Sequence, residues 1–571
     1  MNSGEMATGG RPASFRFRPF GLKPSVSEWV CLVGGLFLVV HYSWFMDDAF
    51  IYFRYVDNLL YLGHGLVFNS GEYVEGFSSP LWVILLIPLR ATGLDYWILI
   101  RLIGVASFVV FWALLVNLNR MLSPPNRPIL NIPLCYLSFN YGVQCYFTSG
   151  TESPLVQVAA VLYAIFILRP GSQSLQLLLA GTVLLRPELL VPFVICLGWG
   201  WIRLKRFPVR MALACLVMTG SWMIFRIYYY ADLFPNTFFL KDVVDVSQGL
   251  AYLQDTANPY WLYQYLGVAV LLMLVCYRRA KPHLHDGDPS VTRFDEGAKA
   301  ANEFRFDLKI PDRLMMVVLA LSIMVYVIKI GGDPRHYRFL AFPFCLLICA
   351  SAGIVENVLA RYRHDAMVIV RIAIVLFVAL RSFTFYPSQL SSHPFFGEEE
   401  HKMVNKINDA SFHRHLKSLA QPPWGGAVGI NLRGAYKRYQ AKHPNRPYTN
   451  VKWGGACCQA YKRFDVRVVH ALGLTDPILA HVDIKADRPA HKLGLRPLSR
   501  DIKNIIASFG NNPHKGMYRE AIAQGKAPPW IAENIDSIEI IERKMFNTHD
   551  FIENLRLAFT FPRRIKLPPK G

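Results

Sequence analysis

The sequence predicts a polytopic α-helical membrane protein that carries a soluble α/β domain at its C-terminal end. The 571 residues are 53% hydrophobic and have a mean hydropathy of +0.25, which is high for a soluble enzyme of this length. Apolar segments of about 17 to 20 residues, long enough to cross roughly 30 Å of hydrocarbon, recur as far as residue 385. Beyond residue 385 the chain is polar and mixed, so the membrane part is expected to end there.

The first 25 residues are basic and contain no apolar run. The next segment, 26–45, is too long for a signal peptide and offers no small-residue cleavage site. We therefore expect residues 1–25 to be a cytoplasmic tail. The positive-inside rule then places Asp47, at the end of the first span, on the outer side.

We expect about 11 membrane crossings between residues 26 and 385. Segments 80–93 and 173–185 are the shorter candidates. If 80–93 and 97–115 both crossed, the loop at 150–154 would fall in the cytoplasm, so we expect one of the two not to span. The other candidates are 26–45, 129–147, 154–168, 189–202, 211–229, 261–276, 315–330, 339–358 and 367–380.

Basic and non-basic loops alternate between these segments. Arg and Lys residues gather at 203–206, 278–281 and 361–363, which are expected to be cytoplasmic. The remaining loops and residues 386–571, the expected soluble domain, then lie outside. Much of the net charge of +21 sits in the loops and the C-terminal third, so we expect a lipid bilayer and no nucleic acid as partner.

Five groups of polar residues interrupt the apolar pattern at the expected outer ends of spans. Charged groups at membrane depth are costly and usually mark a binding path, so we expect one shared cavity there. The groups are MDDAFIYFR (46–54) with Asp47, Asp48 and Arg54, and Glu75 in the same external loop 46–80; TSGTESP (148–154); RPE with Arg186 and Glu188; PNTFFLKD (235–242) with Asn236 and Lys241; and GGDPRHYR (331–338) with Asp333, His336 and Arg338.

Each group also has a purely structural interpretation. Asp47 or Asp48 could cap the helix that begins at residue 49. The segment 186–188 could be a tight hairpin with its charges reaching the interface. Asn236 could be a turn residue, and Lys241 could reach lipid headgroups.

Taken together, the groups suit chemistry on a lipid-linked phosphosugar. An acid pair can take the proton of an attacking hydroxyl or stabilise a cation at a sugar carbon. Lys241, Arg335, His336 and Arg338 could hold the phosphate. The ten cysteines show no CxxC and no metal-ligand spacing, so no cofactor is certain; a divalent cation between Asp and phosphate is compatible with the site but not required.

At these residues the chain resembles the GT-C superfamily of polyprenyl-phosphate-sugar glycosyltransferases. Within that superfamily it is most similar to the terminal arabinofuranosyltransferases of the AftB type. The similar stretches are DDAFIYFRYVDNLLYLGHGLVFNSGEYVEGFSSPLW (47–82), SGTESPL (149–155), LLRPE (184–188), LFPNTFFLKD (233–242), GGDPRHYRFL (331–340) and the segments LGLTDPILAH (472–481) and RPAHKLGLRP (488–497). SGTES departs mildly from the family's more usual SGMET, and GGDPRHYR departs from its usual pattern of GGD, an apolar or aromatic residue and HxR, at Arg335.

The resemblance implies a GT-C-like membrane domain over residues 26–385 and transfer of arabinofuranose outside the bacterial plasma membrane. The donor would be a polyprenyl-phosphate sugar and the acceptor a cell-envelope glycan or glycoprotein. Asp47 and Asp48 would be catalytic. The donor site would be lined by Arg54, Glu75, Arg186, Glu188, Asn236, Lys241, Asp333, His336 and Arg338, and the acceptor would be bound by Thr475, Asp476 and His491.

Three alternatives stay open at this point. The same scaffold could use polyprenyl-phosphate mannose or another pentose or hexose. A transporter of lipid-linked sugars would be expected to show internal hydropathy symmetry and helices broken near the midplane, and neither is clear here. A membrane scaffold without activity would leave the five polar groups unexplained.

Overall fold

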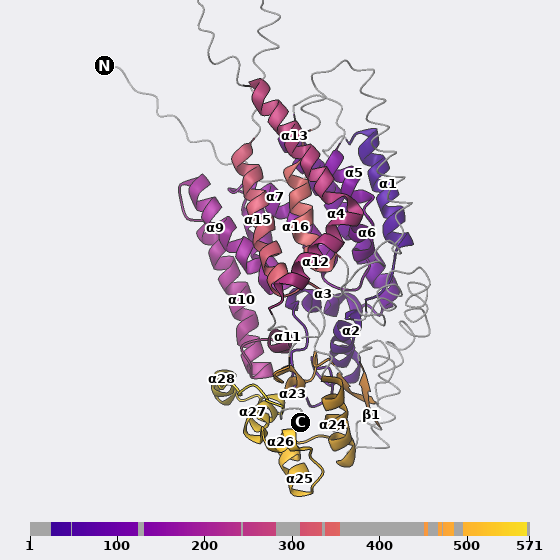
Figure 1. Cartoon of the computed structure of the whole chain (residues 1–571), viewed down its shortest axis with the longest axis vertical. Coiled ribbons are helices and arrows are strands. Elements are labelled where there is room, and N and C mark those ends of the chain that lie inside the picture. Colours follow the sequence, from indigo (N-terminus) through magenta and orange to yellow (C-terminus); the bar gives the residue numbers. More distant parts are fainter. Residues whose placement is uncertain are drawn as a thin grey trace, which may run out of the picture.

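A computed structural model gives the fold (Figure 1). It is a bundle of helices joined at one end to a smaller C-terminal part made of short helices and two strands (Figure 1). The structure describes residues 24–46, 48–123, 131–240, 244–280, 309–333, 337–354, 450–454, 466–470, 472–484 and 495–567.

Helix α7, Ser153–Leu168, lies inside the bundle, where it packs mainly against four helices. Its sequence SPLVQVAAVLYAIFIL is apolar on nearly all sides, as expected for a helix surrounded by other helices. Its main neighbours are α4 (Tyr96–Leu122), α8 (Gln173–Leu185), α15 (Ile310–Lys329) and α16 (Ala341–Ala350). The bundle is completed by α1 (Val26–His41), α5 (Ile132–Ser138), α6 (Tyr141–Tyr146), α9 (Leu190–Leu204), α10 (Val209–Tyr230) and α13 (Leu262–Ala280).

Four helices in the described part of the chain are long and apolar enough to cross a membrane: Tyr96–Leu122, Pro187–Leu204, Val209–Tyr230 and Ile310–Lys329. Their outward side chains, such as Leu216, Ile224 and Val325, are apolar and exposed. An exposed apolar surface of this extent needs lipid around it, so the protein is a membrane protein.

Polar contacts fix which helix ends lie together. Ser25 and Glu28 form a capping box at the start of α1. Glu28 also accepts a hydrogen bond from Arg120, near the end of α4, at 2.9 Å. At the start of α15, Lys309 donates to the carbonyl of Met121 at 3.1 Å. The starts of α1 and α15 therefore share one end of the bundle with the end of α4, as the alternation of loops predicts.

Two expected spans, 129–147 and 339–358, contain only shorter helices in the part of the chain that the structure describes, and the α-helix of the second is α16, with 10 residues. Segment 129–147 does not form one helix, because α5 ends at Ser138 and Asn140 then caps α6 by accepting from the amide of Val143 at 3.1 Å. Of 80–93 and 97–115, one was expected not to span. Helix α3, Pro80–Ala91, has 12 residues and is about 18 Å long, too short to cross, whereas α4 has 27 residues and is about 40 Å long. The expected total of about 11 crossings is not confirmed, and segment 367–380 lies outside the described residues.

Short elements connect the longer helices. Helix α2, Ala49–Asp57, continues into a π-helical turn η2, Asn58–Leu62, and then into the loop 63–79. Glu72 and Glu75 of that loop are almost completely buried. The other connecting elements are η3 (Pro187–Leu189), α11 (Asn236–Leu240), α12 (Val246–Ala257), η4 (Asn258–Tyr260) and η6 (Arg338–Leu340).

In the C-terminal part, strands β1 (Asn450–Gly454) and β2 (Val466–His470) pair in parallel, with Asn450 opposite Val466 and Gly454 opposite His470. Helix α24, Leu495–Ser508, packs on them through Leu498, Ile502 and Ile505, which recur at helical spacing. The strands and helices fit the expected α/β domain, which stays a prediction for residues 386–571. The other helices are α23 (Pro477–Ala480), α25 (Met517–Ala523), α26 (Pro529–Ala532), α27 (Ile535–Met545) and α28 (Phe551–Ala558).

Candidate active site

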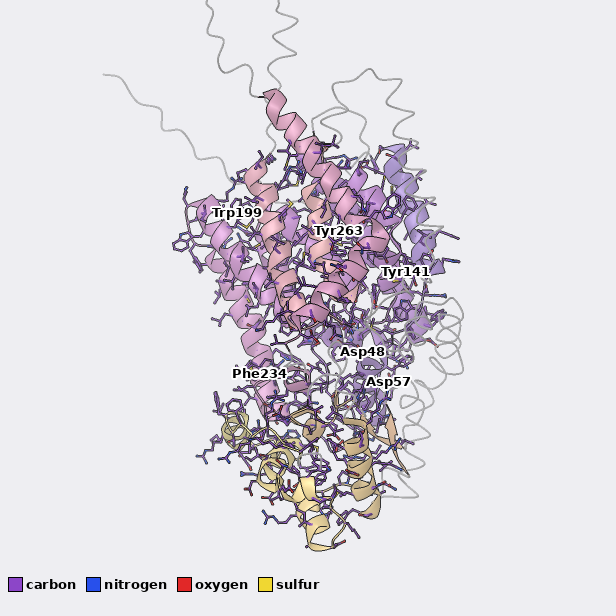
Figure 2. All side chains as sticks on the ribbon, in the orientation of Figure 1. Asp48, Asp57, Tyr141, Trp199, Phe234 and Tyr263 are labelled. Atoms are coloured by element: carbon purple, nitrogen blue, oxygen red, sulfur yellow. The ribbon has the colours of Figure 1, made fainter. Side chains whose placement is uncertain are left out.

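Asp48 lies where the helical bundle meets the C-terminal part (Figure 2). The chain before it is held by a hydrogen bond from the amide of Met46 to the carbonyl of Ser149, at 2.8 Å. Asp48 directly precedes α2, but its side chain makes no capping hydrogen bond to that helix. The carboxylate instead accepts a hydrogen bond from Arg338 Nη1, at 2.6 Å. The Asp48 side chain therefore does not cap α2.

Arg338 reaches Asp48 from a distant part of the chain. It begins η6, after a turn in which Gly331 and Gly332 both have φ of +80°. At Gly332 a Cβ would approach the ring of Tyr252 to 2.4 Å, so only glycine fits this backbone path. Arg338 Nη1 lies 3.8 Å from Asp333, and its Nε is buried without a hydrogen-bond partner among the described residues.

A second arginine lies beside the first. Arg186 Nε lies 3.1 Å from Glu188 and 3.5 Å from Glu152. The guanidinium carbons of Arg186 and Arg338 lie 4.7 Å and 5.7 Å from the centre of the Phe339 ring. The hairpin at 186–188 thus places its arginine against the residue that follows Arg338.

Glu152 connects these groups to the external loop. It precedes α7 and accepts a hydrogen bond from the Tyr52 hydroxyl at 3.0 Å, while its other oxygen faces Arg186. Gly150, two residues before Glu152, has φ of +81°, and a Cβ there would approach that of Ala49 to 2.6 Å. The loop at 148–153 therefore packs directly on the start of α2.

We call the set Asp48, Tyr52, Glu152, Arg186, Glu188, Asp333 and Arg338 the acid–arginine cluster. Asp48 is the most accessible of its four carboxylates, with 29% of the side chain exposed, against 2% for Glu152 and 5% for Asp333. Charges this buried are stable only when paired. Asp48 is thus the carboxylate of the cluster that a substrate can reach most easily.

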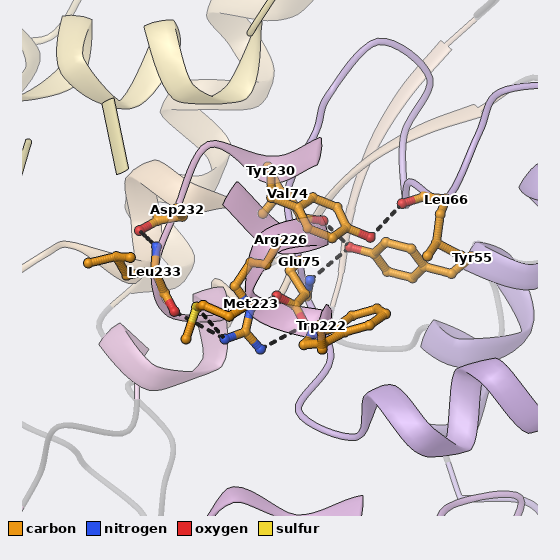
Figure 3. A network of polar contacts seen from close by, with 11 residues as sticks. Tyr55, Leu66, Val74, Glu75, Trp222, Met223, Arg226, Tyr230, Asp232 and Leu233 are labelled. Carbon is orange, nitrogen blue, oxygen red and sulfur yellow. Dashed lines mark hydrogen bonds and ion pairs between the residues drawn. The ribbon is translucent and has the colours of Figure 1, made fainter. Parts of the chain in front are cut away.

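Glu75 belongs to a separate polar network (Figure 3). It pairs with Arg226 near the end of α10 and accepts a hydrogen bond from Trp222 Nε1 at 3.3 Å. Arg226 also donates to the carbonyl of Leu233 at 3.0 Å. Burial raises the pKa of the Glu75 carboxyl, and Arg226 opposes that rise. These contacts attach the loop 63–79 to the end of a long helix.

Arg54 and Asn236 bind backbone carbonyls. Arg54 donates to Phe68 at 2.7 Å and to Val466 of β2 at 2.8 Å. The Asn236 side-chain amide donates to the carbonyls of Gly473 and Leu474 at 2.8 and 3.0 Å. Both side chains therefore join the external loop and α11 to the C-terminal part, and their expected role in donor binding stays a prediction.

The expected acceptor residues lie close to the same loop. Asp476 caps α23 by accepting from the amide of Leu479 at 3.0 Å, and burial raises the pKa of its carboxyl to about 6. The hydroxyl of Thr475 is buried without a hydrogen-bond partner among the described residues. A Cβ on Gly76 would approach the Thr475 methyl to 2.7 Å, so the loop and segment 472–476 are in close contact.

Five residues expected at the site lie outside the described residues: Asp47, Lys241, Arg335, His336 and His491. Within the described residues, no group of three or more His, Cys, Asp or Glu side chains is arranged to hold a metal ion. The sequence-based site set omitted Glu152, Tyr52 and Arg226. The isolated charge of Arg226 inside the apolar segment 211–229 could have indicated a buried partner.

Two curated proteins are similar to this chain. A terminal β-(1→2)-arabinofuranosyltransferase of Mycobacterium tuberculosis is 26% identical over 533 residues, which cover 80% of this chain and 81% of that protein. The chain is therefore similar to this arabinofuranosyltransferase over most of its length. A second terminal β-(1→2)-arabinofuranosyltransferase, of Corynebacterium glutamicum, is 26% identical over 375 residues, and here the match covers 57% of this chain and half of the relative's length. No family model and no solved structure matches the chain.

The comparisons confirm the resemblance expected from the sequence. Both relatives carry the name of a glycosyltransferase, and the first matches across most of both chains. The similarity therefore supports the interpretation as an enzyme over the transporter and scaffold alternatives. It does not test the individual site residues, which rest on the geometry described above.

Proposed function

We propose that the protein is a membrane glycosyltransferase that moves arabinofuranose from a polyprenyl-phosphate donor to a glycan or glycoprotein of the bacterial cell envelope. The reaction takes place on the outer face of the plasma membrane, with the N-terminus in the cytoplasm and the C-terminal domain outside. The observation that carries this proposal is the hydrogen bond between Asp48 and Arg338 inside the acid–arginine cluster. This pair combines a group that can accept a proton with a group that can bind a phosphate.

Arg338 is the phosphate-binding group in this proposal. Its guanidinium is fixed beside the most accessible carboxylate of the cluster, because Nη1 donates to Asp48 at 2.6 Å and lies 3.8 Å from Asp333. Guanidinium binds phosphate through directed, charge-assisted hydrogen bonds. Lys241 and His336 complete this site in the proposal.

Asp48 acts on the acceptor. An acceptor hydroxyl attacks the anomeric carbon, the bond from that carbon to the phosphate oxygen breaks, and the hydroxyl proton passes to the Asp48 carboxylate. The polyprenyl phosphate leaves with its charge held by Arg338. Asp47 is the second member of the pair, and a carboxylate there can stabilise positive charge at the sugar.

Glu152 and Glu188 are positioning residues. They hold Arg186 against Phe339, the residue next to Arg338, and Glu152 also holds Tyr52 of α2. Through these contacts they keep the loop that carries Asp48 and the turn that carries Arg338 at a fixed separation. The acceptor approaches across segment 472–476, where Thr475 and Asp476 adjoin the external loop, and His491 is the third acceptor residue of the proposal.

The test is a transfer assay in liposomes. Polyprenyl-phosphoryl-arabinofuranose and polyprenyl-phosphoryl-mannose are offered separately to the wild type and to the Asp47→Asn and Asp48→Asn variants. Asp536→Asn, an exposed change on α27 far from Asp48, is the control. We expect arabinose transfer by the wild type and the control, and its loss in Asp48→Asn.

The outcomes separate the parts of the proposal. Transfer from the mannose donor alone would keep the mechanism and refute the sugar. Full activity in both Asp variants would refute the site. Comparing the anomeric configuration of product and donor then decides the chemistry: a base at Asp48 gives inversion, whereas a covalent or carboxylate-stabilised intermediate gives retention.

A further inference from the structure

Helix α28, Phe551–Ala558, has two chemically different faces. Phe551, Ile552, Leu555 and Phe559 recur at intervals of three and four residues and are exposed, Ile552 and Phe559 by more than 60%. The opposite face, with Asn554, Leu557 and Ala558, is buried. Four large apolar side chains on one exposed face are unusual for a helix that faces water, and they indicate a partner surface.

The buried face fixes where this helix lies. The side-chain amide of Asn554 donates to the carbonyl of Tyr228 at 2.7 Å, and that of Asn547 donates to the carbonyl of Tyr229 at 3.1 Å. Tyr228 and Tyr229 are among the last residues of α10, one of the helices long enough to cross a membrane. Figure 1 shows α28 beside the end of α10, at the level where the bundle meets the C-terminal part.

The exposed surface of α10 adjoins α28. Leu216, Ile224 and Tyr228 are exposed along α10 and would contact lipid, with Tyr228 at the end where interfacial aromatic residues usually lie. Because α28 is bound to that end, its apolar face continues the apolar surface of the span. The same bilayer that surrounds α10 is therefore the nearest apolar phase for Ile552 and Phe559.

Charge favours a lipid surface as well. Segment 551–567 contains Arg556, Arg563, Arg564 and Lys566 against a single acid, Glu553. Arg556, Arg563 and Lys566 are exposed, whereas Arg564 donates to the carbonyl of Phe239. Basic side chains beside an apolar helix face are typical of helices that lie on membranes with anionic headgroups.

We propose that α28 is an interfacial membrane anchor. Phe551, Ile552, Leu555 and Phe559 insert at the boundary between headgroups and acyl chains next to the end of α10, and Arg556 and Arg563 contact anionic headgroups. The helix holds the C-terminal part against the membrane surface. This inference does not depend on the sugar or on the reaction.

Photo-crosslinking of the full chain in liposomes tests the proposal. A photoreactive phenylalanine analogue replaces Ile552 or Phe559, and the vesicles contain radiolabelled phosphatidylglycerol and phosphatidylcholine. Leu216 on α10 is the lipid-facing control, and Glu533, exposed after α26, is the water-facing control. All four changes replace exposed side chains, so each variant is expected to fold.

We expect lipid labelling at positions 552 and 559 to approach that at 216 and to exceed that at 533 roughly ten-fold. Labelling no higher than at 533 would overturn the proposal. In that case, an adduct of twice the chain's mass would identify the surface as a contact between two copies, and an adduct within one chain would show that another segment covers it.

A second arm tests the headgroup contact. Arg556→Gln combined with Arg563→Gln should lower labelling at position 559 in phosphatidylglycerol vesicles at least about three-fold, and leave it unchanged in pure phosphatidylcholine. Equal labelling of both proteins in phosphatidylglycerol would refute the role of the two arginines.

Discussion

The pair between Glu75 and Arg226 allows a quantitative prediction about how the external loop is held. The two side chains are almost buried, with 2% and 11% of their surfaces exposed. Removing one partner of such a pair leaves an uncompensated charge and costs about 3 to 5 kcal/mol, whereas replacing both partners with neutral groups costs much less. We therefore expect Arg226→Met to destabilise the protein by about 3 kcal/mol at pH 8, and Glu75→Gln combined with Arg226→Met by about 1 kcal/mol.

The destabilisation of Arg226→Met should depend on pH. Burial already raises the pKa of Glu75 above its ordinary value of 4.5, and loss of the arginine removes the main opposing effect. When the pKa of an acid is higher in the folded than in the unfolded protein, the acid stabilises the fold fully at pH values below its unfolded-state pKa. That stabilisation is lost as the pH rises through its folded-state pKa. The deficit should therefore be small near pH 5 and full at pH 8.

Thermal unfolding in nanodiscs, followed for the four proteins of the double-mutant cycle at both pH values, measures this. Arg226→Met should lower the midpoint by roughly 5 °C more at pH 8 than at pH 5, and the double variant should show little pH dependence. If Arg226→Met and the double variant unfold at the same temperature at pH 8, the two residues are not coupled, and the reasoning about the loop fails.

Three further predictions concern the site. Arg338→Lys keeps the charge but loses the directed N–H groups, so kcat/KM should fall at least about 30-fold, measured in the transfer assay; an unchanged value would exclude phosphate binding by Arg338. Glu152→Gln keeps the shape of the side chain but removes the charge facing Arg186. We expect kcat to fall about 10-fold or more with little change in the thermal unfolding midpoint. A change in the midpoint without a change in kcat would mean that Glu152 has a structural role only. Asp476 has a folded pKa near 6 against an ordinary 3.8, so up to about 3 kcal/mol of stability should be lost between pH 4 and pH 6.5. Asp476→Asn keeps the helix cap but cannot ionise. Its thermal unfolding midpoint should therefore rise relative to that of the wild type as the pH increases over this range, and a constant difference between the two midpoints would contradict the raised pKa.

Sequence reasoning found the segments of the acid–arginine cluster but not its pairings. A charge at the end of an apolar run is visible in the sequence, so Asp48, Arg186 and Arg338 were expected at one end of the bundle. Which charge faces which depends on packing between distant segments, as for Asp48 and Arg338, which are 290 residues apart. Glu152 belongs to one of the five polar groups but was given no role at the site, because its partners, Tyr52 and Arg186, come from other segments.

Periodicity also could not separate spans from buried short helices. The segment 129–147 is apolar enough to cross, but Asn131 and Asn140 each supply a helix cap inside it, through the amides of Leu134 and Val143. Two caps nine residues apart favour two short helices over one long helix. The choice between residues 80–93 and 97–115, by contrast, is decided by helix length once the boundaries of α3 and α4 are known, because only α4 is long enough to cross.

The contacts of Arg54, Glu75 and Asn236 give the external loop a second function beside carrying Asp48. Each of these side chains is hydrogen-bonded to a backbone carbonyl or paired with an opposite charge. Together they connect α2, the end of α10 and segment 473–474. The external loop 46–80, which carries Asp48, is therefore also a surface against which the C-terminal part packs. A substitution at Asn236 or Arg54 should move the C-terminal part relative to Asp48, and in the proposed mechanism it would act on acceptor placement, not on the phosphate bond. That separates the group that reacts from the groups that bring the second substrate to it.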